Sequence, residues 1–284
     1  MQKWLKRALA VLLLLIVVFA AWLLTRPREP EYQGRSLSAW LDDYNRTGTE
    51  GAEQASTAIR AMGTNCLPYL ITHIKHNPSP WTVKLVLLLS KQHVIKLPFY
   101  GVDRYFSASI IALHALGPQA APLCPNLLAL TKNPRTWWWA NMSLLAIGTN
   151  SIPFLELACQ NTNQAGAYAA LMIALMKSTQ PPHFTWGRMN APLNGKPITV
   201  VGYGVLPETV AETANLLEHP SPAVRRASAE ALALYNGSRY TRAWKLAVPL
   251  LVKACGDTNE AVRISATTTL KSIDPEAAAK AGIK

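Results

Sequence analysis

Residues 224–232 read VRRASAEAL, and residues 262–270 read VRISATTTL, so the second copy follows 38 positions after the first. Small or apolar residues recur in the first copy at positions 224, 227, 231 and 234, the spacing of one helix face. The apolar run at 246–255 (LAVPLLVKAC) between the copies is long enough for a second helix. A helix pair that repeats about every 40 residues predicts a stacked array.

A second pattern marks the turns inside earlier pairs. Residues 62–69 (MGTNCLPY) match residues 147–154 (IGTNSIPF), and residues 116–122 (LGPQAAP) keep the Gly and the later Pro. We expect each Gly to end a helix in the left-handed conformation, with a Thr or Asn cap and an early Pro in the next helix.

These segments resemble the HEAT repeats, and in particular the short HEAT-like repeats first described in phycobilisome lyases. The resemblance is strongest in residues 221–275, with their Val-Arg start and following small residues. It implies an α-solenoid used mainly for binding. We therefore expect an all-α fold of about six helix pairs in residues 36–284, with irregular insertions at about 81–103 and 181–206. A short strand or hairpin arm is expected at 198–201.

The expected helices begin with an amphipathic cap at 36–44. The helix pairs follow at 51–62 with the helix after residue 64, 103–116 with 119–130, 135–147 with the helix after Pro153, 164–176 with 207–217, 221–255, and 257–281.

The N-terminus has the pattern of a membrane-inserting segment. Residues 8–24 (ALAVLLLLIVVFAAWLL) carry no charge, and the flank 1–7 is basic. A spanning helix needs about 20 apolar residues, whereas the core of a secretory signal is about 7–15 residues long. We expect one transmembrane anchor at 8–25 followed by a linker at 26–35; export after signal cleavage is the alternative. Flanking positive charge favours the N-terminus inside and the array on the outer, extracytoplasmic side.

The net charge of +12 has two sources. Residues 1–35 hold six Lys or Arg and two acidic residues, which leaves 22 and 14 in residues 36–284, a net charge of +8. The longest Lys/Arg run there is Arg225-Arg226. These charges are typical of solvated helix faces, or of a basic surface for nucleic acid or another polyanion.

No pattern indicates chemistry. The four cysteines form no C-x-x-C motif, the histidines are dispersed, and the acidic residues are scattered. We expect no catalytic, cofactor or metal site; the lyase activity that the resemblance suggests brings no catalytic motif with it. The favoured function is a non-catalytic, membrane-tethered scaffold that binds another protein.

Six residues are candidate partner contacts. Consecutive helical residues point about 100° apart, so Trp137, Trp138 and Trp139 cannot all share one buried stripe. They either pack beneath the 181–206 insertion or offer an exposed Trp to a partner. Arg225 and Arg263 recur at matched places. The resemblance to HEAT repeats implies a structural ladder, in which such an arginine pairs with an acid of the neighbouring repeat, here Asp257 or Glu260; contact with a ligand is the alternative. The complete set is Trp137, Trp138, Trp186, Tyr203, Arg225 and Arg263.

Overall fold

The computed structural model describes Leu13, Val17 and residues 29–46, 48–75, 102–178, 187–193, 196–202, 207–235 and 241–283. The chain divides into two compact units, Met1–Tyr69 and Leu70–Lys284.

The first unit opens with a short antiparallel hairpin of β1 (Glu31–Tyr32) and β2 (Arg35–Ser36). Its two loop residues, Gln33 and Gly34, both have positive φ values, 52° and 71°. That is what a two-residue type I′ turn requires. The linker predicted at 26–35 therefore includes the first strand and its turn.

The hairpin is held against the predicted cap helix, α2 (Leu37–Arg46). Trp40 Nε1 donates to the Tyr32 carbonyl oxygen at 3.3 Å, and the Arg35 guanidinium carbon lies 4.1 Å from the Trp40 ring centroid. Leu37 and Leu41 are buried, and α2 packs on α3 (Gly48–Met62). The apolar stripe of the cap helix thus faces its neighbour, as an end helix requires.

The matched turns adopt the predicted glycine conformation. Gly63, Gly117 and Gly148 have φ values of 58°, 52° and 91°, which only glycine adopts without strain. Each precedes or begins a 3₁₀ turn, at Gly63–Cys66, Gly117–Leu123 and Thr149–Ser151. The helix α4 (Leu67–Lys75) follows the first turn.

The predicted Thr or Asn cap is wrong for the third of these turns. Thr149 and Asn150 lie within the 3₁₀ turn, and the N-cap of the next helix is Ser151, with no side-chain cap bond. The Ser151 hydroxyl instead donates backwards, to the carbonyls of Leu144 at 2.6 Å and Gly148 at 2.8 Å. The Ser151 side chain therefore links this 3₁₀ turn to the end of the preceding helix.

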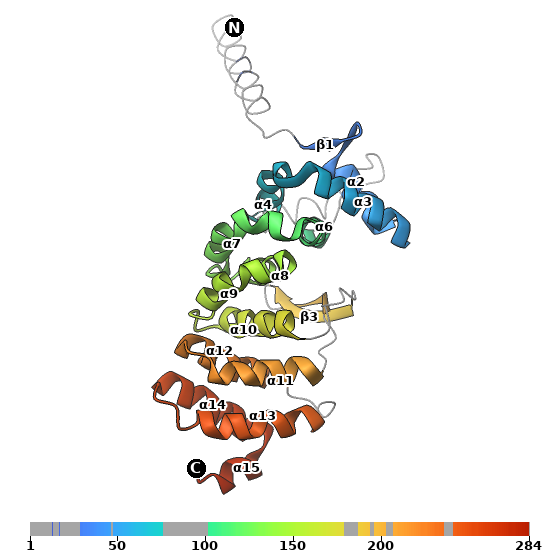
Figure 1. The fold of residues 1–284 in the computed structure, drawn as a ribbon. Coiled ribbons are helices and arrows are strands. Elements are labelled where there is room, and N and C mark those ends of the chain that lie inside the picture. The colour runs from blue at the N-terminus through green and yellow to red at the C-terminus, as the bar shows by residue number, and fades with distance from the viewer. Residues whose placement is uncertain are drawn as a thin grey trace, which may run out of the picture. The chain divides into compact units, whose positions relative to one another are not determined.

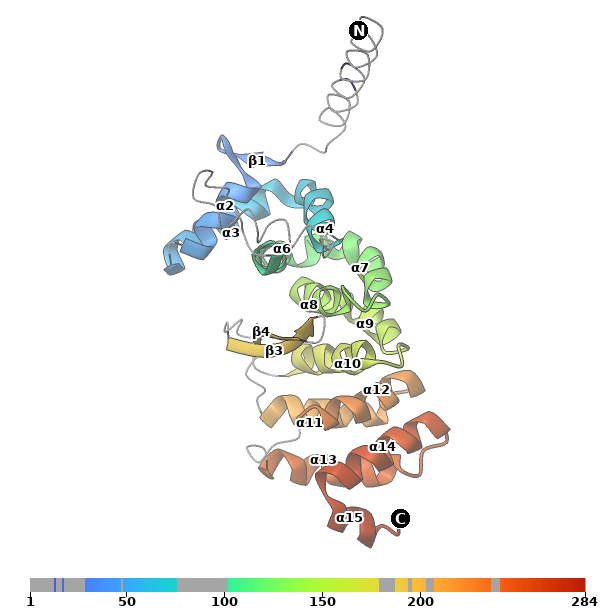
Figure 2. The ribbon, with the colours of Figure 1, turned by 180° about the vertical axis from the view of Figure 1, so that it is seen from behind.

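In the second unit, successive helices pack in two rows (Figures 1 and 2). In one row α6, α8, α10, α12 and α14 contact each other in that order; in the other α7 contacts α9, α11 contacts α13, and α13 contacts α15. The helices are α6 (Val102–Leu116), α7 (Cys124–Thr131), α8 (Trp137–Ile147), α9 (Ile152–Ala158), α10 (Gln164–Lys177), α11 (Pro207–Asn215), α12 (Pro222–Ala233), α13 (Thr241–Ala254), α14 (Glu260–Ile273) and α15 (Pro275–Lys280). The helical class is confirmed for the described residues.

The insertion predicted as irregular at 181–206 contains a regular hairpin. The strands β3 (Gly187–Leu193) and β4 (Lys196–Gly202) pair antiparallel, from Gly187 opposite Gly202 to Leu193 opposite Lys196. The hairpin arm expected at 198–201 lies in β4. Each described unit thus carries a two-stranded sheet beside its helices, and the helical class still holds for the described residues. Of the other predicted insertion, residues 81–101 lie outside the described part.

Small residues form the contacts between layers. Val224, Ala227 and Ala231 on α12 are completely buried, as are Val262 and Ala266 on α14. Side chains of this size let neighbouring helices approach closely. Three of the four positions of the predicted face are therefore packed, whereas the fourth, Leu234, is 41% exposed near the end of α12.

No helix within the described residues is long and apolar enough to cross a membrane. Of the predicted transmembrane segment at 8–25, only Leu13 and Val17 are described; both are helical and exposed. The rest of that prediction lies outside the described residues.

Candidate functional site

The repeated arginines sit in the first turns of α12 and α14. Pro222 begins α12, where its missing N–H costs no helical hydrogen bond, and Ser221 is the N-cap. Three residues further on, Arg225 turns its side chain back over this start: its Nη1 donates to the carbonyls of His219 and Pro220, both at 2.9 Å. The guanidinium is therefore fixed to the loop that enters its own helix.

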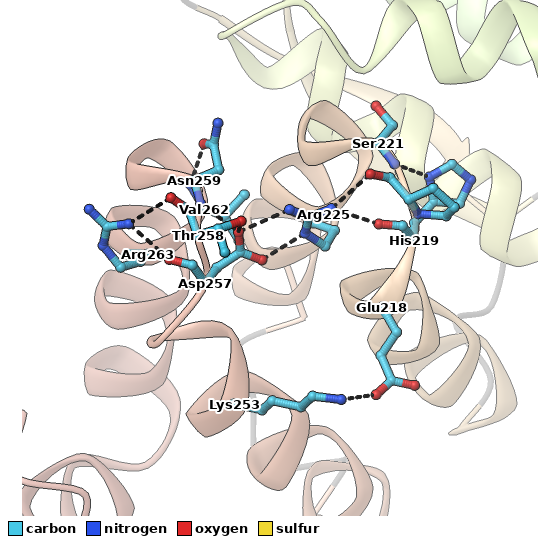
Figure 3. Close-up of polar contacts among 11 residues, drawn as sticks. Glu218, His219, Ser221, Arg225, Lys253, Asp257, Thr258, Asn259, Val262 and Arg263 are labelled. Carbon is cyan, nitrogen blue, oxygen red and sulfur yellow. Dashed lines mark hydrogen bonds and ion pairs between the residues drawn. The ribbon is translucent and has the colours of Figure 1, made fainter.

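The other edge of the Arg225 guanidinium reaches the next layer (Figure 3). Its Nε lies 2.7 Å from Asp257 Oδ2, and its Nη2 lies 2.9 Å from Asp257 Oδ1. This two-point pairing is the strong geometry for arginine and carboxylate. It confirms the predicted ladder between Arg225 and Asp257.

The pair is well shielded, since the side chains of Arg225 and Asp257 are 13% and 11% exposed. Hydrogen bonding from Arg225 is the largest cause that lowers the pKa of Asp257, and the backbone N–H of Asn259 adds to it at 2.7 Å. The same hydrogen bond raises the pKa of Arg225. Both groups therefore stay charged at neutral pH.

Arg263 repeats the first half of this arrangement. Its Nη1 donates to the carbonyls of Asp257 at 2.8 Å and Thr258 at 3.1 Å, which correspond to His219 and Pro220 in the preceding repeat. Asn259 caps α14, and its side chain accepts from the N–H of Val262. The two arginines thus make the same backbone contacts 38 residues apart.

A second network, which the sequence reasoning missed, surrounds Arg226. Its Nη1 donates to both carboxylate oxygens of Glu230 at 2.7 and 2.9 Å, and its Nη2 donates to the carbonyls of Cys159 at 2.7 Å and Asn161 at 2.6 Å. Ser265 on α14 bonds Glu230 at 3.1 Å. Arg226 is 7% exposed, so a buried charge links the loop before α10, helix α12 and helix α14.

That loop is held close to α10. A Cβ at residue 166 would lie 2.2 Å from the Asn161 carbonyl oxygen, so only glycine fits there. Asn163 caps α10 by accepting from the N–H of Ala165 at 2.9 Å. The carbonyls that receive Arg226 are therefore placed by the start of α10.

Other charged pairs lie nearer to solvent. Lys253 Nζ lies 2.6 Å from Glu218 Oε1, with side chains 74% and 53% exposed. Such a pair contributes only about 0–1 kcal/mol. His219 Nε2 lies 3.4 Å from Glu156 Oε1.

The tryptophan candidates belong to a different cluster. Trp138 is buried and Trp137 half-buried, and both contact Tyr168 on α10, with ring centroids 4.9 and 5.3 Å away. Trp139 is also buried. The candidates thus form two groups, one on α8 and one on α12 and α14. The remaining two, Trp186 and Tyr203, lie outside the described residues.

Three of the four cysteines are buried in the described part of the chain. Burial raises the pKa of Cys66 and Cys124 to about 11 and that of Cys159 to about 12, so these thiols are poor nucleophiles. No group of three or more His, Cys, Asp or Glu side chains able to hold a metal occurs within the described residues.

The pair of Arg225 and Asp257 and the packed faces of α12 and α14 lie in one segment of the chain that matches a family of repeats. Residues 210–281 match HEAT repeats. This HEAT segment includes most of α11 and all of α12, α13 and α14. Arg225, Arg263 and the members of the Arg226 network on α12 and α14 therefore lie within the segment that matches HEAT repeats.

Comparison with individual proteins adds little. No curated protein matches the chain. A crystal structure of an engineered protein from a structural genomics consortium aligns with 85% of this chain and 99% of its own, at 13% identity. Its TM-score of 0.28 is too low to support an argument.

Proposed function

We propose that the chain is a membrane-tethered HEAT-repeat scaffold whose array binds another protein. The observation that carries this proposal is the HEAT match at residues 210–281. HEAT repeats usually serve as scaffolds for protein interactions. The apolar segment 8–24 would supply the tether, with the N-terminus inside and residues 36–284 on the outer side.

The arrangement of the second unit supports a binding role. Its helices α6, α8, α10, α12 and α14 contact each other in that order, as do α11, α13 and α15. In an α-solenoid, stacked layers of this kind would create an extended binding surface. The charged residues between the layers stabilise the stack and supply no chemistry of their own.

A polyanion partner is the alternative, based on the net charge of +12. Three basic residues of the HEAT segment count against it. Arg225 pairs with Asp257, Arg226 with Glu230, and Lys253 with Glu218. Neutralisation by these carboxylates reduces the charge that the segment offers to an anion.

Two experiments test the proposal. A phosphatase that is active only outside the cytosol, fused after Lys284, should be active if the array lies on the outer side; a fluorescent protein that folds only inside should stay dark. Fluorescence without phosphatase activity would reverse the topology.

The binding role requires a direct partner. The tagged full chain should enrich a protein over an unrelated single-pass anchor with the same tag, and that protein should bind the purified chain saturably. Failure to enrich any protein reproducibly would reject the scaffold. Binding to duplex or single-stranded nucleic acid that weakens steeply with salt would support the polyanion alternative.

A further inference from the structure

Arg263 carries half of the contacts that Arg225 makes. Both arginines use Nη1 on two carbonyls of the preceding loop. Arg225 also uses Nε and Nη2 to bind the carboxylate of Asp257. Within the described part of the chain, no carboxylate occupies the same edge of Arg263, and Figure 3 shows this side chain at the outer end of the ladder.

We propose that this edge of Arg263 binds the carboxylate of an aspartate or glutamate at the start of a helix in a different protein. The proposal rests on the scaffold function and names a contact site for its partner. The partner's carboxylate would pair with Arg263 as Asp257 pairs with Arg225.

The pair of Arg225 and Asp257 shows the geometry that we expect for this contact. Asp257 lies just before α14, and its Oδ1 accepts both the Nη2 of Arg225 and the backbone N–H of Asn259. A carboxylate at a helix start is favoured by the helix dipole and by free backbone N–H groups. A carboxylate also matches the planar guanidinium edge at two points.

The guanidinium of Arg263 is already positioned for such a ligand. Its Nη1 donates to the carbonyls of Asp257 and Thr258 at 2.8 and 3.1 Å. These bonds fix the Arg263 side chain as the matching bonds to His219 and Pro220 fix Arg225. A ligand therefore meets a group whose rotamers are restricted before binding, which lowers the entropy cost.

The neighbouring surface offers apolar contact. Where α12 carries Arg226, which is 7% exposed, α14 carries Ile264, which is 59% exposed. A large exposed apolar side chain beside a charge with an open edge is the composition of a docking site.

The test uses the purified full chain in mild detergent and a labelled peptide of residues 256–273 (GDTNEAVRISATTTLKSI) as the probe. This peptide presents an aspartate ahead of a helix, as the chain does at Asp257. Fluorescence anisotropy should show saturable binding, and Arg263→Ala should weaken it by about tenfold, the effect expected for a charge-assisted pair. Arg263→Lys should restore little of the affinity, because an ammonium cannot pair at two points.

Two controls separate this contact from general charge and from folding. Lys280→Ala removes one exposed positive charge outside the ladder and should leave the affinity unchanged. A peptide with Asp257→Asn tests the carboxylate without altering the protein, and it should bind about tenfold more weakly.

Equal binding of the Asp257→Asn peptide, or unchanged binding by Arg263→Ala, would overturn the proposal. Loss of duplex DNA binding in Arg263→Ala would also overturn it, because the ligand would then be a phosphate. Loss of self-association in sedimentation would overturn it as well, because the ligand would then belong to a second copy of this chain. A captured partner that Arg263→Ala still retains would reject this site and leave the scaffold standing. Peptide binding through Arg263 without any captured partner would support this site and reject the scaffold function.

Discussion

Replacement of Arg226 by methionine tests whether the buried network holds the C-terminal layers together. The methionine keeps much of the apolar stem but removes four hydrogen bonds, two to Glu230 and two to the carbonyls of Cys159 and Asn161. The variant therefore leaves two backbone acceptors and one carboxylate without their donor.

The expected loss of unfolding free energy depends on which hydrogen bonds the former partners of Arg226 retain. An orphaned buried acceptor costs about 1–3 kcal/mol, so the two carbonyls together cost at least about 2 kcal/mol. Glu230 is 30% exposed and retains Ser265, so its added cost is small, about 1 kcal/mol. We expect Arg226→Met to reduce the free energy of unfolding by about 3 kcal/mol.

Hydrogen exchange is the suitable assay, because it reports the opening free energy of each helix. Amides of α10, α12 and α14 should lose about 3 kcal/mol of protection, which is more than a hundredfold faster exchange. Lys280→Met serves as the control, since it changes an exposed residue to the same side chain. Protection in Arg226→Met within 1 kcal/mol of the wild type would refute the structural role of the network.

Three further predictions follow from the same helices. Leu232→Asp puts an unpaired charge at a completely buried position and should unfold α12 to α15; unchanged melting by circular dichroism would contradict the assigned helix face. The lowered pKa of Asp257 means that its pair with Arg225 stabilises the fold above the unfolded pKa of 3.8, with the gain lost as the pH falls through the lower folded pKa. Acid titration should therefore show Asp257→Asn to be less stable than the wild type at pH 7, with a difference that shrinks as the pH falls below 3.8, and a constant difference would reject the pair as the cause. Iodoacetamide at pH 8 should label Cys255 before the three buried cysteines, as peptide mass spectrometry would show, and early labelling of Cys159 would mean that its layer opens.

The ladder could be predicted because the repeat supplies its own partner. When a nine-residue motif returns after 38 positions, an acid just before the second copy lies next to the arginine of the first. The sequence and its resemblance to HEAT repeats therefore named two candidate acids, Asp257 and Glu260, and the structure selects Asp257. The left-handed glycines could be predicted for a similar reason, since three matched turns point to one backbone requirement.

The Arg226 network could not be predicted in the same way. Arg226 and Glu230 are four residues apart, which is typical of an exposed pair on a helix. Their burial depends on carbonyls about 65 residues earlier, whose position follows from packing. One signal was present: the first copy of the motif has Arg226 where the second has Ile264, so this arginine is specific to one layer.

The hairpin at 187–202 also left a signal. Asn194-Gly195 between two extended runs is a strong sequence pattern for a two-residue hairpin loop. The prolines and glycines nearby suggested irregular structure instead, although Pro192 and Pro197 oppose each other in a two-stranded sheet, where each strand has a free edge. The Trp137 and Trp138 contacts with Tyr168 were out of reach, because the helical period does not reveal which neighbouring side chain lies opposite.

The reach of Arg226 has a mechanical consequence. A pull on the C-terminal end is carried from α14 through Ser265 and Glu230 to Arg226, and from there to the loop at 159–161 that precedes α10. These short polar bonds act alongside helix packing, so the load passes to α10 before α12 and α14 can separate. The layers from α10 to α14 should therefore yield together, as one step in a force-extension trace.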